Sequence, residues 1–165
     1  MKAVIVADAG PLIALAKIDQ VTLLPALFAE VHIPAYVWQE AAGNILMPGA
    51  AAVRAFADAH ATIHDDSVDP VVQRLCVEID AGEAQAIALA QSLRCGVLID
   101  DLLGRGVAKR MGLPVIGVLG VLLQAKRAGH IAAIRPSLDA LVLARYRVSD
   151  TLIAAVLKQA NEQLF

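Results

Sequence analysis

Two apolar segments of the sequence end in carboxylates. The segment Ala3–Ala7 runs into Asp8, and the segment Gly96–Ile99 runs into Asp100 and Asp101. Both segments are short and rich in β-branched residues, which is typical of buried parallel strands. Ligand sites in open parallel sheets lie at the carboxyl ends of the strands, so we expect these acids to share one cleft.

Two further acids belong to helices that neighbour such strands. Glu83 opens the predicted helix that leads into the second acidic strand, and Glu40 lies on the predicted helix after the strand around His32. Mg²⁺ and Mn²⁺ prefer oxygen ligands and keep several waters, so three or four carboxylates in one cleft can hold one or two such ions. Bound ions lower the pKa of a water and stabilise the attacking and leaving oxygens. The chemistry indicated is metal-assisted cleavage of a phosphodiester.

Helix capping is the alternative explanation for the same acids. Asp8 precedes a predicted helix, as does Asp100 or Asp101, and Asp is a favoured N-cap residue. Glu83 in a first helical turn complements the helix dipole, and Glu40 can be an exposed residue of an amphipathic helix. Spacing alone leaves the site and the caps evenly balanced.

The elements that must position these acids alternate between strands and helices. We predict strands at residues 3–7, 31–33, 61–64, 96–99 and 115–116. We predict helices at residues 12–18, 21–28, 35–42, 48–59, 71–79, 83–93, 102–111, 118–128, 137–146 and 149–164. The alternation predicts an α/β fold with a central parallel sheet and helices on both faces, a three-layer α/β/α arrangement.

Length and composition are those of one ordinary domain. The chain has 165 residues and no internal repeat or convincing linker, so we expect a single domain over residues 1–165 that includes a C-terminal helical pair at about 136–165. Hydrophobic residues make up 58%, above the usual share of roughly 45–50%, which hints at an oligomer interface. No apolar stretch reaches the ~20 residues that a membrane crossing needs. Cys76 and Cys95 form no CxxC pattern, which favours a reducing cytoplasm.

Positive charge is concentrated toward the C-terminus. Residues 1–99 hold 5 Lys/Arg against 11 Asp/Glu, whereas residues 100–165 hold 9 against 5. Arg105, Lys109 and Arg110 follow the second acidic strand and are the candidate phosphate contacts, although a solvated helix face explains them equally well. More distant candidates are Lys126, Arg127, Arg135, Arg145 and Arg147.

The acidic segments resemble the PIN-domain family, and more specifically PIN-like proteins related to the VapC toxins of bacterial toxin–antitoxin pairs. The similarity continues beyond the acids and covers nearly the whole chain. The segments that carry it are residues 6–13, 33–40, 81–90, 98–112, 115–129 and 138–161.

The resemblance implies a Mg²⁺- or Mn²⁺-dependent endoribonuclease with a PIN-like fold. Asp8, Glu83 and Asp100 would hold the metal, Glu40 would support it or orient the attacking water, and Asp101 would belong to the same site. Arg105 would help to neutralise the scissile phosphate. The resemblance also implies an RNA substrate, a small antitoxin protein as a partner, and a homodimer.

The sequence departs from the family pattern at two places. The third acid is Glu83, where many toxins have Asp, and Ile99 stands where the family commonly has Thr or Ser beside the last acids. Which of Asp100 and Asp101 faces the metal stays open.

Two other functions compete with the nuclease. One is a catalytically weak PIN-like module that binds nucleic acid or protein without cutting. The other is a phosphotransfer domain, which also places acids at strand ends. The segment Asp8-Ala9-Gly10 lacks the second acid of a DxD phosphatase pattern, and no Lys ends the strand Val115-Ile116, so this alternative ranks well below the nuclease.

Overall fold

The computed structural model describes residues 2–162, and its centre is a five-stranded sheet in which every strand pairing is parallel. The strand order is β3-β2-β1-β4-β5. The strands are β1 (Val4–Ala7), β2 (Glu30–Pro34), β3 (Ala61–His64), β4 (Gly96–Leu98) and β5 (Val115–Ile116). Helices flank this sheet, so the predicted α/β fold is confirmed.

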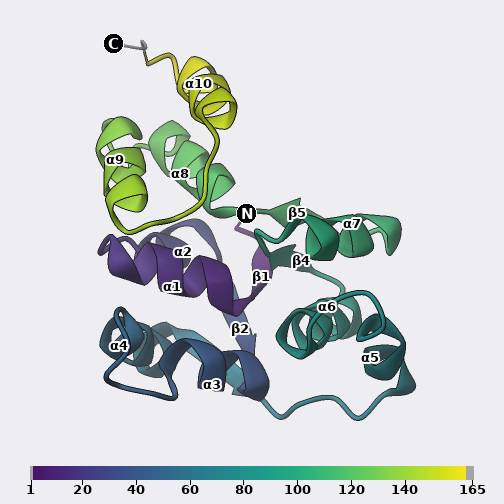
Figure 1. Ribbon diagram of the computed structural model, residues 1–165. Helices are drawn as coiled ribbons and strands as arrows, with labels where there is room; N and C mark the ends of the chain where they lie inside the picture. Colours follow the sequence, from purple (N-terminus) through teal and green to yellow (C-terminus); the bar gives the residue numbers. More distant parts are fainter. Residues whose placement is uncertain (1, 163–165) are drawn as a thin grey trace.

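Helices connect the strands and cover both sides of the sheet (Figure 1). Figure 1 shows α1 and α2 on one side and α5 and α6 on the other, and α6 contacts β1, β2 and β4. The helices are α1 (Ala9–Lys17), α2 (Leu23–Leu27), α3 (Ala35–Ala42), α4 (Ala50–His60), α5 (Pro70–Leu75), α6 (Ala81–Leu93), α7 (Leu102–Arg110), α8 (Val118–Arg127), α9 (Arg135–Leu143) and α10 (Asp150–Gln159).

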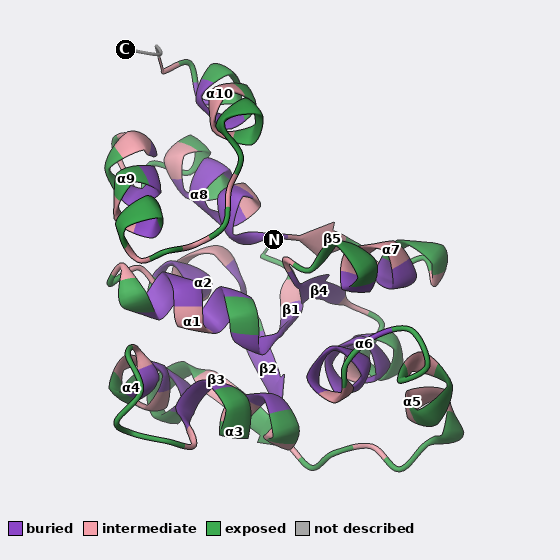
Figure 2. Cartoon of the chain, viewed as in Figure 1, coloured by how far each residue is buried: buried purple, intermediate pink, exposed green. Residues whose placement is uncertain are grey.

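The core consists almost entirely of Ala, Val, Leu and Ile, as the shortage of aromatic residues in the sequence requires. Figure 2 shows the buried residues gathered on the strands and on the inner faces of the helices. The central strands β1 and β4 are buried on both faces, with Val6, Val97 and Leu98 at 0% exposure. A strand of this kind reads as a continuous apolar run, which is why both were visible in the sequence.

Element bounds differ from the sequence-based expectation at several helix ends. α1 begins at Ala9, three residues earlier than predicted, because Pro11 is accepted in a first helical turn. α5 ends at Leu75, four residues earlier than predicted, and the chain continues as turns at residues 76–78, although Val72 and Leu75 pack against the core. α9 ends at Leu143, shortly before Arg145 takes a left-handed φ of 64°. α10 ends at Gln159, and residues 163–165 lie outside the described part of the chain.

The two C-terminal helices are tied to α8 by polar contacts. The Lys126 ammonium group donates to the carbonyl of Ala160 and pairs with Glu162 at 3.0 Å. Glu162 also accepts from the backbone N–H of Ile134 and Arg135 at the start of α9. These contacts join the start of α9 and the residues after α10 to α8. The connector between α9 and α10 brings Tyr146 close to Asp100, at the carboxyl edge of the sheet. Within residues 2–162, no helix is long and apolar enough to span a membrane.

Candidate active site

Asp8 and Asp100 follow two strands that lie next to each other in the sheet. The backbone N–H of Asp8 donates to the carbonyl of Leu98 at 2.9 Å, which joins the end of β1 to the end of β4. The chain leaves β1 toward β2 and leaves β4 toward β5, on opposite sides. Such a switch point is where open α/β sheets form ligand sites.

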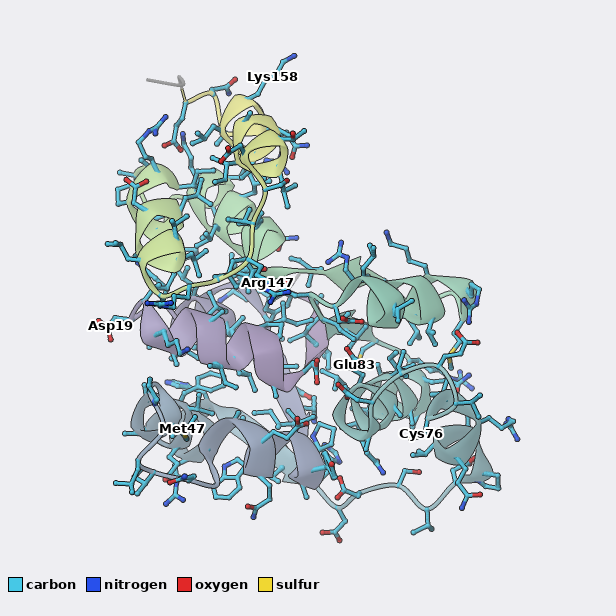
Figure 3. All side chains as sticks on the ribbon, in the orientation of Figure 1. Asp19, Met47, Cys76, Glu83, Arg147 and Lys158 are labelled. Carbon is cyan, nitrogen blue, oxygen red and sulfur yellow. The ribbon has the colours of Figure 1, made fainter. Side chains whose placement is uncertain are left out.

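A pocket of about 180 Å³ opens at this point, hereafter the acid pocket. All five acids singled out in the sequence line it, together with one that the sequence analysis missed. Figure 3 shows Glu83, labelled, where α1, α6 and α7 come together. The acids that line the pocket are Asp8, Glu40, Asp80, Glu83, Asp100 and Asp101.

Asp8 is the most deeply placed strand-end acid, with only 8% of its surface exposed. It stands at the N-cap position of α1, yet its side chain makes no capping hydrogen bond. The pKa of Asp8 is raised to about 7, mainly by burial and also by the charges of Asp80, Glu40 and Asp100, while a backbone hydrogen bond from Ala9 lowers it. Capping therefore does not explain Asp8, and its carboxylate is free to serve a ligand.

Glu83 and Asp80 form a reciprocal capping box at the start of α6. Asp80 accepts from the backbone N–H of Glu83 at 2.8 Å, and Glu83 accepts from that of Asp80 at 3.2 Å. Glu83 is buried all the same, and a Cβ on Gly104 would lie 3.3 Å from its Oε1. Burial, with a smaller contribution from the neighbouring carboxylates, raises the pKa of Glu83 to about 7. Helix capping and a place in the acidic site therefore both apply to Glu83, because its Oε2 serves the cap while the residue also lines the pocket.

Glu40 reaches the acid pocket from α3. Its Oε1 occupies the position that a Cβ on Gly82 would need, so the absence of a side chain at residue 82 makes room for the carboxylate. Glu40 is exposed, and partial burial together with the charge of Asp80 raises its pKa. The glycine in the first turn of α6 is thus what permits α3 and α6 to bring their acids together.

Asp100 and Asp101 make different contacts. Asp101 is exposed, and its Oδ2 accepts from the backbone N–H of Gly104 at 3.0 Å, the N-cap contact of α7. Asp100 Oδ1 accepts from the N–H of Val118 at 3.0 Å, whereas Oδ2 is buried and accepts no well-formed hydrogen bond within the described residues. Burial raises the pKa of Asp100, and Val118, the nearby Tyr146 hydroxyl and a neighbouring guanidinium lower it. Of these two acids, Asp100 is therefore the one with a buried carboxylate oxygen that lacks a hydrogen-bond partner among the described residues.

The acid pocket has the chemistry of a divalent cation site. None of its described lining residues is Lys, Arg or His, so protein cations do not balance the carboxylates within it. Oxygen-only donors suit Mg²⁺ or Mn²⁺. Within residues 2–162, no three potential ligands converge closely enough to surround one ion. Mg²⁺ is usually held by one or two carboxylates with the remaining positions filled by water, so this arrangement fits a hydrated ion.

The three candidate phosphate contacts on α7 differ in how close they lie to the acid pocket. Arg105 is half-buried beside Asp100, and its Nη1 donates to the carbonyl of Ile99 at 3.0 Å. Lys109 is exposed, and Arg110 is paired with Glu78 at 2.6 Å on an exposed surface. Of the three, Arg105 is the one that neighbours the acid pocket.

Asp80 and Tyr146 are the site residues that the sequence analysis did not single out. Asp80 had a local signal, since Asp80-x-x-Glu83 is the spacing of a capping box. Tyr146 had none, because only the tertiary fold brings the α9–α10 connector to Asp100.

Comparison with known families identifies one family. A family model described as a PIN domain matches residues 4–162, and PIN domains are generally nucleases that typically use divalent metals. No curated protein is significantly similar to the sequence. The match spans nearly all of the chain, from β1 to the residues after α10, and the chain therefore belongs to the PIN-domain family.

Proposed function

We propose that this protein is a Mg²⁺- or Mn²⁺-dependent endoribonuclease that hydrolyses RNA phosphodiester bonds. The observation that carries the proposal is the acid pocket: six carboxylates at a strand-end switch point with no protein cation among the described residues that line it. Burying carboxylates together without a cation is unfavourable, so the arrangement makes physical sense when the fold is built around a metal.

Asp8, Glu83 and Asp100 are the proposed metal-holding residues. Asp8 and Glu83 are buried, and Asp100 offers an oxygen without a hydrogen-bond partner among the described residues. A bound divalent ion would supply a water of lowered pKa and neutralise charge at the phosphate. The raised pKa of Asp8 and Glu83 means that both must lose protons before they bind an ion at neutral pH.

The remaining residues act around that centre. Glu40 enters from α3 on the side of Asp80 and orients the attacking water or supports the ion. Asp101 holds the first turn of α7 and adds negative charge at the pocket. Arg105, fixed by its hydrogen bond to the Ile99 carbonyl, neutralises charge on the scissile phosphate.

Cleavage of a mixed set of labelled RNAs tests the proposal. The wild-type chain is compared with Mn²⁺, with EDTA, and with the double variant Asp8→Asn/Asp100→Asn. Asp58→Asn is the matched control, since Asp58 is exposed on α4. Cutting that needs metal, survives Asp58→Asn and disappears in the double variant is the expected result. Cutting that persists in the double variant would overturn the assignment.

A PIN-like module that binds RNA or protein without cutting is the second candidate. Two observations favour it. Glu83 and Asp101 already serve as helix caps, and no three described ligands surround a common point. Absence of both metal-dependent cutting and calorimetric Mn²⁺ binding would put this candidate first.

We also propose that the nuclease is the toxin of a toxin–antitoxin pair, restrained by a small antitoxin, and that it acts as a cytoplasmic homodimer. The resemblance of the acidic segments to VapC-related proteins supports this, and both cysteines are free thiols, as a reducing compartment requires. Growth arrest on expression of the wild-type chain, absent for the Asp8→Asn/Asp100→Asn variant, is the expected outcome.

A further inference from the structure

A second cavity adjoins the acid pocket and shares Asp100 with it. This cavity, hereafter the arginine pocket, has a volume of about 450 Å³ and lies between β5, the first turns of α7 and α8, and the α9–α10 connector. Its polar side chains besides Asp100 are Arg105, Tyr146 and Arg147. Pockets for small ligands run from roughly 300 to 1,000 Å³, so a group larger than a hydrated ion fits here.

Arg105 is built into the wall of this pocket. Its Nη1 is held by the Ile99 carbonyl at 3.0 Å, and a guanidinium carries further N–H donors. A Cβ on Gly117 would lie 2.6 Å from Asp100 Oδ1 and 2.7 Å from Arg105 Nη1. The glycine therefore lets the carboxylate and the guanidinium pack close to the backbone and leaves the cavity open between α7 and α8.

The connector between α9 and α10 supplies the other two polar groups. Tyr146 is half-buried with its hydroxyl toward Asp100, and Arg147 is exposed. No hydrogen bond or ion pair joins Arg147 to another described residue, and Figure 3 shows it on the connector above α1. Two arginines thus face one cavity that contains a single carboxylate, and Arg147 has its donors available.

Apolar side chains complete the pocket. Leu102 is 84% exposed and Leu152 is 46% exposed, so both present apolar surface at this cavity. With the ring of Tyr146 they offer a surface that suits a flat, partly apolar group. Cations beside such a surface match a nucleotide, whose phosphate is anionic and whose base stacks on aromatic or apolar side chains.

The second cavity that adjoins the acid pocket is acidic rather than basic. A cavity of about 430 Å³ shares Glu40 with the acid pocket and is lined also by Tyr36, Gln39 and Asp66. No cation lines it among the described residues, and two carboxylates do, so it repels phosphate. The acid pocket thus shares one carboxylate with each of these two cavities, and of the two the arginine pocket is the one that attracts a phosphate.

We propose that the arginine pocket is a subsite for one nucleotide of single-stranded RNA next to the scissile phosphodiester. The phosphate of that nucleotide lies between Arg105 and Arg147, and its base packs against Tyr146 and the exposed leucines. The proposal rests on the proposed nuclease function for the statement that this RNA is the substrate. The binding itself requires no metal, because the pocket's cations are its own arginines.

The experiment measures binding of a labelled single-stranded RNA in EDTA, where metal-dependent cutting cannot occur. Arg147→Ala is the main variant, since an exposed side chain can be removed without loss of the fold, and Arg74→Ala on α5, which is also exposed, is its matched control. We expect Arg147→Ala to weaken binding about tenfold and to reduce the slope of log affinity against log salt by about one, while Arg74→Ala changes neither.

Tyr146→Leu and Tyr146→Phe separate the ring from the hydroxyl. The leucine variant should weaken binding several-fold because a stacking surface is lost, whereas the phenylalanine variant should bind as the wild-type chain does. A nucleoside monophosphate should compete with the RNA, and the corresponding nucleoside without phosphate should compete far less. Circular dichroism verifies that each variant is folded.

Two results distinguish the failure of this proposal from the failure of the nuclease. Unchanged affinity and salt slope in both Arg147→Ala and Tyr146→Leu, in a chain that still cuts RNA with Mn²⁺, overturns the subsite and leaves the nuclease standing. Loss of affinity in both variants, in a chain that cuts no RNA, retains the subsite as an RNA-binding pocket and overturns the nuclease.

Discussion

The carboxylate of Glu40 occupies the space that a side chain on residue 82 would fill. Helix α3 can therefore bring its acid to the first turn of α6 only because Gly82 carries no Cβ. The presence of Glu40 in the acid pocket thus depends on the close approach of α3 to α6 at Gly82.

Gly82→Ala should displace Glu40 from the pocket without unfolding the chain. Alanine is favoured over glycine inside a helix by about 1 kcal/mol, so the free energy of unfolding should stay level or rise slightly. RNA cleavage should fall about tenfold or more, the usual scale for loss of a group that supports a metal site. Gly106→Ala in α7 is the control, since a Cβ there meets nothing within 4 Å. Unchanged cleavage in Gly82→Ala would remove Glu40 from the mechanism.

Asp8→Asn should stabilise the metal-free protein at high pH. The folded pKa of Asp8 is about 7, above its usual value of 3.8, so the folded state holds the proton more tightly than the unfolded state. The contribution of Asp8 to the free energy of unfolding is thus most favourable at low pH, and it is lost as the pH rises from about 4 to 7. Asparagine carries no charge, so the variant should gain on the order of 1–3 kcal/mol over wild type at pH 8 and little at pH 4.

Urea unfolding in EDTA at the two pH values measures this difference, with Asp58→Asn as the matched control on an exposed face of α4. An Asp8→Asn variant that is no more stable than wild type at pH 8 would show that ionisation of Asp8 does not destabilise the folded state.

The fold could be predicted largely from the sequence because its central strands, β1 and β4, are buried on both faces. Continuous apolar runs mark β1 and β4, and the segments at Ala35–Ala42 and Ala61–His64 were predicted with the bounds that the structure has. Helix ends were less predictable. α5 ends at Leu75 and runs into turns at residues 76–78, although no Gly or Pro stands there to mark its end.

The candidate site was predictable only in part, because the tertiary fold alone brings some of its residues together. Asp8 and Asp100 follow recognisable strands, so their neighbourhood follows from sheet topology. Asp80 was overlooked although its spacing to Glu83 signals a capping box. Tyr146 and Arg147 reach the site through the fold of the α9–α10 connector, and no local pattern encodes that approach.

Metal binding should release protons. Asp8 and Glu83 both have a pKa of about 7 in the metal-free chain, so at pH 7 each is partly protonated and must lose its proton to bind a cation. Mn²⁺ should therefore raise the melting temperature more at pH 8 than at pH 5.5. Calorimetric titration in two buffers with different ionisation enthalpies measures the released protons directly. Equal binding enthalpies in the two buffers would contradict the raised pKa values.

Asp100→Asn and Asp101→Asn should have unequal effects on metal binding. Asparagine caps a helix about as well as aspartate, so Asp101→Asn retains the contact to the Gly104 N–H and keeps α7 in place. Asp100→Asn removes the charge of the acid whose buried Oδ2 has no hydrogen-bond partner within the described residues. We expect Mn²⁺ affinity to fall at least tenfold in Asp100→Asn and only a few-fold in Asp101→Asn. Calorimetric titration of both variants measures this, and an equal or larger loss in Asp101→Asn would exchange the roles of the two acids.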